Sequence, residues 1–367
     1  MKFQYYMPTL ILMGENCVLE NRAVLAGLGK KALIVTGRNS AKTNGSLEDM
    51  KKALMANEQE YEVFDKVVSN PTVDCVYEGA SFAKENGVDF IVALGGGSPM
   101  DAAKAIALLS CQDIPREKLF LGGFGDKVLP MAFVPTTAGT GSEVTQYSIL
   151  TNDAAKTKTS LASPVLFPKV AFLDGKYMKS LSRNVTINTA VDALSHCVEG
   201  YLSNKANGIS DALALEGMTV IAKQFDNLKA FTLSTDERSK LLYASTLGGM
   251  VIAQSGTTAV HSMGYSLTYF KSIDHGRANG LLLAEFLKFI QKEKPEKIEL
   301  LLEKMRLSSL AEFAGILDAL LGEKEAVTAE EAKLYSTIAI QAKNIGNCLV
   351  IPTEQDLFAL YKAVFGF

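Results

Sequence analysis

The hydrophobic pattern of the chain changes about halfway along, and this change constrains the fold more than any other feature. In the first half, short apolar runs such as 31–36 alternate with segments of helical spacing such as 71–86. Unbroken apolar strands that alternate with helices are typical of a parallel sheet covered on both faces. In the second half, strand-like runs are scarce and stretches rich in Ala, Leu, Glu, Lys and Met predominate. We therefore predict an α/β domain over residues 1–179 and an all-α domain over residues 180–367.

The second half is expected to form long helices. The segments with helical composition are 185–201, 209–225, 235–253, 280–292 and 297–321. No Gly/Ser-rich linker separates the two halves of the chain. Because ligands often bind where two packed domains meet, we expect an active-site cleft between them.

Charge and cysteine usage exclude several classes of protein. The 367 residues are 48% apolar and carry a formal net charge of −3, so no basic field is present for nucleic acid or an anionic membrane. The five cysteines are scattered without a C-x-x-C pair, which argues against a disulfide framework and suits a reducing compartment. The N-terminus lacks a signal-peptide pattern, and no run of about 18 apolar residues predicts a transmembrane helix. We expect a cytoplasmic protein that acts on small molecules.

One strand-like run ends directly on three glycines. Gly95, Gly96 and Gly97 lead through Ser98 and Pro99 into a segment of helical spacing. Glycines let backbone N–H groups approach an anion, and the start of a helix adds its own N–H groups and its dipole. Ser98 suits either a helix cap or a phosphate donor. The pattern therefore predicts a pyrophosphate site, with a tight turn that needs small residues as the alternative.

A second polar loop follows the next strand. Residues 135–145 read Pro-Thr-Thr-Ala-Gly-Thr-Gly-Ser-Glu-Val-Thr. Loops at the carboxyl ends of strands are where open α/β sheets bind ligands. Two such loops after neighbouring strands favour a nucleotide, although a turn with capping hydroxyls would have the same composition.

The chain holds only three histidines, and their positions suggest a metal site. Asp192 and His196 are four residues apart in a helical context, which places both side chains on one face. His261 and His275 are the other two. Three imidazoles and a carboxylate form a suitable ligand set for Zn(II) or Fe(II). A local ion pair between Asp192 and His196, and a helix-terminal role for His275, are the alternatives.

Four motifs occur in order over most of the chain. They are GGGSPMDAAK at 95–104, PTTAGTGSEVT at 135–145, DALSHCVEGY at 192–201, and H-x13-HG at 261–276. As a set they closely resemble the iron-containing (group III) alcohol dehydrogenase family. The resemblance implies an N-terminal dinucleotide-binding domain, a helical C-terminal domain, a divalent metal and NAD(P)-dependent interconversion of alcohols with aldehydes or ketones.

The resemblance also implies roles for individual residues. The metal, Fe(II) or Zn(II), would be held by Asp192, His196, His261 and His275. The pyrophosphate would lie on Gly96, Gly97 and Ser98; the residues lining the rest of the cofactor would be Thr136, Thr137, Ser142, Asp101 and Lys158. Dimers are common in the family, so a homodimer is expected.

Two departures from the family pattern affect the predicted mechanism. Many members carry a proton-relaying His four residues after the third ligand, and here that position is Tyr265. NAD-preferring members tend to carry an Asp directly after the strand that corresponds to residues 31–36. This chain has Gly37 there, followed by Arg38, Asn39 and Ser40. Loss of that carboxylate removes repulsion of a 2′-phosphate, so we predict a preference for NADP(H) over NAD(H). An aromatic packing role for Tyr265 and a simple turn at Gly37 are the alternatives.

The sequence therefore predicts a metal-dependent oxidoreductase that transfers a hydride between a metal-bound alcohol or diol and nicotinamide. Glu199, three residues after His196, is expected either to orient an imidazole or to lie in solvent. A glycerol-type dehydrogenase or a dehydroquinate-synthase-like lyase on the same scaffold is the rival enzyme. A nucleotide- or metal-binding regulatory protein is the rival without catalysis.

Overall fold

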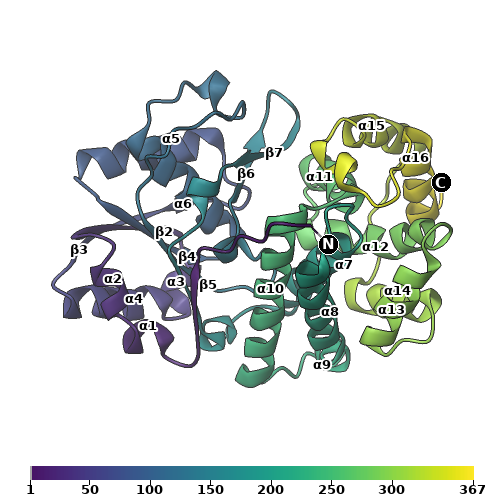
Figure 1. Cartoon of the computed structure of the whole chain (residues 1–367), viewed down its shortest axis with the longest axis horizontal. Helices are drawn as coiled ribbons and strands as arrows, with labels where there is room; N and C mark the ends of the chain where they lie inside the picture. The colour runs from purple at the N-terminus through teal and green to yellow at the C-terminus, as the bar shows by residue number, and fades with distance from the viewer. Residues whose placement is uncertain (1) are drawn as a thin grey trace. The chain divides into compact units, whose positions relative to one another are not determined.

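The computed structural model describes residues 2–367, which divide into two compact units (Figure 1). One unit spans Met7–Leu181. The other spans Ser182–Phe367 together with the N-terminal segment that ends at Tyr6. Within residues 2–367, none of the helices has the length and apolarity needed to cross a bilayer.

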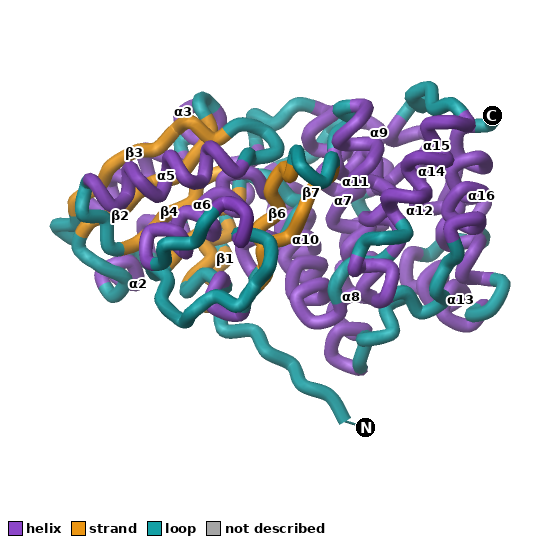
Figure 2. Tube along the Cα trace, turned by 90° about the horizontal axis from the view of Figure 1, so that it is seen from above, coloured by secondary structure: helices purple, strands orange, loops and turns teal. Residues whose placement is uncertain are grey.

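The first unit is built on a six-stranded sheet whose pairings are all parallel, which confirms the predicted fold class. The strands, in their order across the sheet, are β1 (Leu10–Met13), β8 (Val170–Leu173), β5 (Met131–Pro135), β4 (Phe90–Gly95), β2 (Lys31–Gly37) and β3 (Glu60–Val67). Figure 2 shows these strands flanked by helices. The helices of this unit are α1 (Cys17–Glu20), α2 (Ala23–Ala26), α3 (Ser40–Thr43), α4 (Ser46–Ala56), α5 (Val73–Glu85) and α6 (Gly97–Cys111).

Both faces of the sheet are buried, which explains why its strands are apolar throughout. Along β2, Leu33 and Val35 join one core cluster with residues of α5 and α6. Ala32 and Ile34 join a second cluster with residues of α1, α2 and α4. Successive side chains of a strand point to opposite faces, so a strand covered on both sides needs an apolar residue at every position.

A two-stranded antiparallel hairpin, β6 (Tyr147–Asn152) and β7 (Thr157–Ala162), was not expected from the sequence. Its strands carry many hydroxyl side chains and are largely half-buried or exposed. Such strands lack the apolar run that identifies the strands of the main sheet.

The second unit is helical. Its helices are α7 (Arg183–Tyr201), α8 (Gly208–Ala222), α9 (Phe225–Ala230), α10 (Thr235–Ser255), α11 (Ala259–Lys271), α12 (His275–Gln291), α13 (Pro295–Met305), α14 (Leu310–Leu321), α15 (Ala329–Ala339) and α16 (Glu354–Phe365). Among residues 182–367, no segment forms a strand of an extended sheet.

Two predicted helix boundaries were wrong. The segment 297–321 is two helices, because Arg306 adopts a left-handed conformation with φ 59° and Ser309 then caps α14 by accepting a hydrogen bond from the backbone of Glu312. The segment 209–225 ends as a helix at Ala222, and Phe225 starts the separate helix α9.

Candidate metal centre and dinucleotide site

Most of the predicted cofactor residues lie at or just after the carboxyl ends of neighbouring strands of the sheet. In the register of the sheet, Thr36 of β2 lies opposite Leu94 of β4, and Gly95 of β4 lies opposite Pro135 of β5. The loops that follow these three strands therefore start side by side. Between β2 and β4 the strand order also reverses, and such switch points are where open α/β sheets bind ligands. These loops and the start of α6 carry Gly37, Arg38, Asn39, Ser40, Gly96, Gly97, Ser98, Asp101, Thr136, Thr137 and Ser142.

The glycine turn is packed against the second polar loop. A Cβ atom on Gly96 would lie 2.8 Å from Thr137 Oγ1, and one on Gly97 would lie 2.6 Å from Thr140 Cγ2. Glycine is therefore required by this close approach, which both a tight turn and an anion cradle would need. Gly96 is the N-cap residue of α6, so the expectation that Ser98 caps this helix is wrong. The Ser98 hydroxyl accepts a hydrogen bond from the backbone of Asn70 at 3.2 Å.

A buried polar network joins the start of α6 to the second polar loop. The Ser142 hydroxyl donates to Asp101 Oδ1 at 2.7 Å and accepts from Lys104 Nζ at 2.8 Å. Lys104 also donates to Thr145 Oγ1 and to the carbonyl of Tyr147. Ser142 is thus engaged within the protein and links the two loops.

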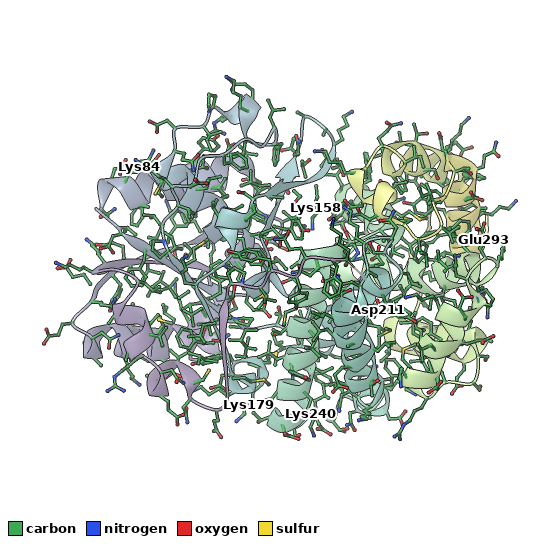
Figure 3. The ribbon with its side chains drawn as sticks, viewed as in Figure 1. Lys84, Lys158, Lys179, Asp211, Lys240 and Glu293 are labelled. Carbon is green, nitrogen blue, oxygen red and sulfur yellow. The ribbon has the colours of Figure 1, made fainter. Side chains whose placement is uncertain are left out.

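Burial governs the charges of this network. Burial lowers the pKa of Lys104 to about 8, against the attraction of Asp101 and Glu143. It raises the pKa of Asp101, against the charge of Lys104 and the hydrogen bond from Ser142. Lys158, on β7 (Figure 3), is close enough for its charge to act on Asp101. Lys158 therefore belongs to the same electrostatic neighbourhood as Asp101.

Positive charges surround the end of β2. Gly37 is the last residue of β2, Arg38 is exposed, and Asn39 and Ser40 begin helix α3. Asp65 of β3 accepts a hydrogen bond from Lys42 at 2.7 Å. This bond, with the charges of Lys42 and Arg38, lowers the pKa of Asp65.

Helix packing brings the predicted metal ligands together. Asp192 and His196 lie on α7, His261 lies on α11, and His275 is the first residue of α12. One ligand atom each from Asp192, His261 and His275 falls within a group whose members are all within 4.8 Å of one another. Asp192 and His261 are almost completely buried.

His196 joins this group through His261. The two Nε2 atoms are 2.9 Å apart, and the ring centroids are 4.7 Å apart. Two imidazole nitrogens bound at 2.0–2.1 Å to one tetrahedral Zn(II) would lie about 3.3–3.4 Å apart, so the two Nε2 atoms are slightly closer than that separation. The donor set fits a divalent ion.

Glu199 orients one of the imidazoles. Its side chain is fully buried, and a carboxylate oxygen is hydrogen-bonded to His261 Nδ1. The other oxygen accepts from the backbone and hydroxyl of Thr258, at 2.8 and 2.7 Å. Burial would raise the pKa of Glu199, but the charge of His261 and these hydrogen bonds lower it. If His261 donates its proton from Nδ1 to Glu199, its Nε2 carries the lone pair that a metal requires.

Tyr265 packs against the same cluster. Its ring stacks on His275 with centroids 5.4 Å apart and an interplanar angle of 18°, and it meets the ring of His261 edge-on. The structure thus gives Tyr265 the packing contact that was the alternative to a relay, with its ring beside two of the candidate ligands.

Asn279 was missed by the sequence analysis. It lies one turn after His275 on α12, and its Nδ2 is 3.0 Å from Asp192 Oδ1, 3.1 Å from His261 Nε2 and 3.3 Å from His275 Nε2. The i,i+4 spacing from His275 was a signal that could have found it, but an asparagine on a helix has many common structural roles.

Two family models match nearly the whole chain. Residues 8–175 match the model described as "Iron-containing alcohol dehydrogenase", and residues 186–365 match "Fe-containing alcohol dehydrogenase family, C-terminal". Each of the two units therefore has its own match within the same family.

Individual relatives agree with the family models. "Alcohol dehydrogenase 4" of Schizosaccharomyces pombe is 33% identical over 79% of this chain and 69% of its own length. "1,3-propanediol dehydrogenase" of Klebsiella pneumoniae is 32% identical over 80% of this chain and 77% of its own length. "NAD-dependent methanol dehydrogenase" of Bacillus methanolicus is 29% identical over 98% of this chain and 93% of its own length. The crystal structure of an iron-containing alcohol dehydrogenase from Thermotoga maritima has a TM-score of 0.91 at 42% identity, with both chains fully covered.

Proposed function

This chain belongs to the iron-containing alcohol dehydrogenase family, and on that premise we propose that it interconverts small alcohols or diols with aldehydes, using NADP(H) and a divalent ion. Within this proposal, Asp192, His196, His261 and His275 hold the ion. The observation that supports it is that Asp192, His261 and His275 place ligand atoms within 4.8 Å of one another, and that His196 Nε2 lies 2.9 Å from His261 Nε2.

The proposed ligands suit Lewis-acid chemistry. A bound divalent ion lowers the pKa of an alcohol and polarises a carbonyl, without changing its oxidation state. Asp192 supplies one negative charge and the three imidazoles supply none when neutral, so the set leaves a net positive field for substrate oxygen. Glu199 favours the required tautomer of His261 through its contact with Nδ1.

The histidine inventory constrains the proton path. All three histidines of the chain belong to the proposed ligand set, so none serves as a general base. A proton released from the alcohol must leave through water, a hydroxyl of the cofactor, or the phenol of Tyr265. We assign Tyr265 to this path because its ring stacks on His275. Tyr265→Phe is expected to lower kcat and shift its pH profile; an unchanged profile would leave Tyr265 as a packing residue only.

The dinucleotide would bind at the carboxyl ends of β2, β4 and β5, which together with the loops that follow them form the dinucleotide edge. Gly96, Gly97 and Ser98 offer backbone N–H groups at the start of α6, where the helix dipole favours a pyrophosphate. Thr136 and Thr137 line the adjoining loop, which Ser142 fixes to Asp101. In the family pattern, Asp101 and Lys158 then lie toward the nicotinamide.

The residues at the end of β2 favour NADP(H) over NAD(H). Gly37 brings no carboxylate, Arg38 is exposed, and the nearby Asp65 is already paired with Lys42. The local field is therefore positive and favours a 2′-phosphate. One relative is named as NAD-dependent, so the preference rests on these residues rather than on the family.

The substrate class and the reaction are tested together by a steady-state assay. Protein reconstituted separately with Fe(II) and Zn(II) is mixed with NADPH or NADH and a panel of short aldehydes and hydroxyaldehydes. We expect net oxidation of NADPH with at least one short aldehyde, and we include hydroxyaldehydes because one relative is named for a diol. Absence of net cofactor turnover with every combination would contradict the proposal. The homodimer and the cytoplasmic location stay predictions.

A further inference from the structure

We propose that Asn279 is a positioning residue of the metal centre, which fixes the carboxylate of Asp192 beside the imidazoles of His261 and His275. This inference rests on the proposed function, since it concerns the geometry of the proposed ligand set. It assigns a purpose to a fully buried amide that belongs to none of the motifs from which the ligands were predicted.

The amide nitrogen of Asn279 lies among three of the proposed ligands. It donates to Asp192 Oδ1 at 3.0 Å, and it is 3.1 Å from His261 Nε2 and 3.3 Å from His275 Nε2. The same Asp192 oxygen is 3.9 Å from His261 Nε2 and 3.8 Å from His275 Nε2. The amide therefore contacts the carboxylate through the oxygen that faces the imidazoles. Carboxylates that ligate metals are commonly held by such a hydrogen bond.

Hydrogen-bond chemistry fixes which end of the amide faces Asp192. A carboxylate only accepts, so it pairs with the NH2 group, whereas the amide oxygen would face it acceptor to acceptor. The Nε2 atoms of His261 and His275 lie on the same side; since their lone pairs are assigned to the metal, the hydrogen bond to Asp192 is the one that orients the amide. The amide nitrogen must therefore point into the ligand set.

The opposite end of the amide has no compensating partner. Among residues 2–367, no group forms a hydrogen bond with Asn279 Oδ1, which is buried. An unpaired buried amide oxygen destabilises a fold, so an apolar side chain of similar size would serve better if packing were the only role. The presence of an amide at this position is thus explained by the hydrogen bond that its nitrogen donates to Asp192.

Neighbouring backbone holds the amide in place. A Cβ atom on Gly264 of α11 would collide with Asn279 Oδ1. Glycine at this position lets α11 approach α12 closely enough to support the amide from behind. The side chain is therefore held between Gly264 and Asp192, with little freedom to turn away.

The test measures metal binding rather than catalysis. Full-length protein is stripped with a chelator and titrated with Co(II) in competition with a chromophoric chelator, and the visible spectrum of bound Co(II) is recorded. Asn279→Leu keeps the branched outline of the side chain but removes the donor. We expect it to weaken Co(II) binding about 10–100-fold and to change the Co(II) spectrum, which reports ligand geometry.

Leu287→Ala is the matched control, because Leu287 is fully buried two turns further along the same helix. We expect it to lower the melting temperature while leaving the Co(II) affinity and spectrum unchanged. Gly264→Ala retains every proposed ligand but displaces Asn279 Oδ1, so we expect it to weaken Co(II) binding in the same direction. If Asn279→Leu does not fold, Gly264→Ala decides the question alone.

The outcomes separate this inference from the function on which it rests. If wild-type protein fails to bind Co(II) tightly, the metal centre is wrong and the role of Asn279 is wrong with it. If wild-type protein binds Co(II) and Asn279→Leu, or Gly264→Ala where it decides alone, gives the same affinity and spectrum, only the role of Asn279 is contradicted.

Discussion

The two candidate sites of this protein are built in opposite ways. The candidate metal centre consists of side chains from three helices, of which Asp192, His196 and His261 are buried and His275 is partly exposed. The dinucleotide edge consists mainly of backbone at the ends of adjacent parallel strands, where Gly96 and Gly97 pack against Thr137 and Thr140. At the metal centre the chemistry depends on which side chains are present. At the dinucleotide edge it depends on the absence of a side chain at Gly96 and Gly97.

This difference separates the expected consequences of mutation. Removing a side chain should damage the metal centre, and adding one should damage the dinucleotide edge. Metal affinity and cofactor affinity should then respond to different substitutions, which variants of His261, Gly97 and Gly37 test. A variant of Lys104 tests the charges of the network that joins the dinucleotide loops. The expected effects run from the largest to the smallest.

The largest effect is expected for His261→Ala. His261 is the imidazole that meets both His196 and Glu199, so its loss breaks the ligand set and leaves a buried carboxylate without its partner. A catalytic metal supplies several kcal/mol of transition-state stabilisation, so kcat/KM should fall by about a thousandfold or more. Metal content by mass spectrometry should fall together with kcat/KM, while the Kd for NADPH stays within about threefold of the wild-type value. Full activity without bound metal would contradict the account.

The next effect concerns pH and Lys104, which stabilises the loops of the dinucleotide edge. Its pKa is about 8 in the folded protein because of burial, whereas an unfolded lysine keeps its ordinary value near 10.5. Between these values the unfolded chain binds the proton and the folded protein does not, so the contribution of Lys104 to stability rises with pH and is lost as pH falls through about 8.

Comparison with Lys104→Met isolates this contribution. The free energy of unfolding of the wild type, relative to the variant, should increase by on the order of 3 kcal/mol as the pH rises from 7.5 to 10.5. Chemical denaturation at several pH values measures it. A difference between the two proteins that does not change with pH would show that Lys104 titrates normally.

Gly97→Ala should affect the cofactor alone. The added Cβ would lie 2.6 Å from Thr140 Cγ2, so the glycine turn must shift away from the second polar loop. We expect KM for NADPH to rise about tenfold, which corresponds to about 1.4 kcal/mol, while Co(II) affinity stays unchanged. Gly315→Ala is the matched control, because no heavy atom lies near the added Cβ, and it should leave both quantities unchanged. Equal losses of metal and NADPH binding in Gly97→Ala would break the comparison.

The smallest effect is expected for Gly37→Asp. The new carboxylate at the end of β2 would repel a 2′-phosphate and accept hydrogen bonds from a 2′-hydroxyl. The ratio of kcat/KM for NADPH to that for NADH should therefore fall about tenfold, divided between a loss with NADPH and a gain with NADH that are each only about threefold. A wild-type protein that already favours NADH would show that the positive charge of Arg38 does not select the cofactor.

The two regions also differ in how far sequence predicted them. The strands β2, β4 and β5 were predicted because both of their faces are buried, which forces an unbroken apolar run. The hairpin of β6 and β7 was missed because its largely half-buried, hydroxyl-rich strands carry no such signal. Local patterns thus identified the sheet and the glycine turn, whose geometry is set by consecutive residues.

Tertiary packing decided what the sequence left open at the metal centre. The scarcity of histidine singled out His261 and His275, but nothing in their spacing shows that Glu199 bonds to His261 rather than lying in solvent. Asn279 was missed for the same reason, since its contacts with Asp192 and His261 arise only when α12 packs on α7 and α11. Residues that act through another side chain become visible only once the helices are placed.

The central claim is that one divalent ion is shared by Asp192, His196, His261 and His275. Anomalous diffraction from crystals grown with Zn(II) or Fe(II), recorded at the absorption edge of the metal, tests it most directly. We expect one peak per chain within about 2.0–2.2 Å of a nitrogen of each histidine and of an oxygen of Asp192. A peak elsewhere, or one that leaves His196 or His261 uncoordinated, would contradict the claim.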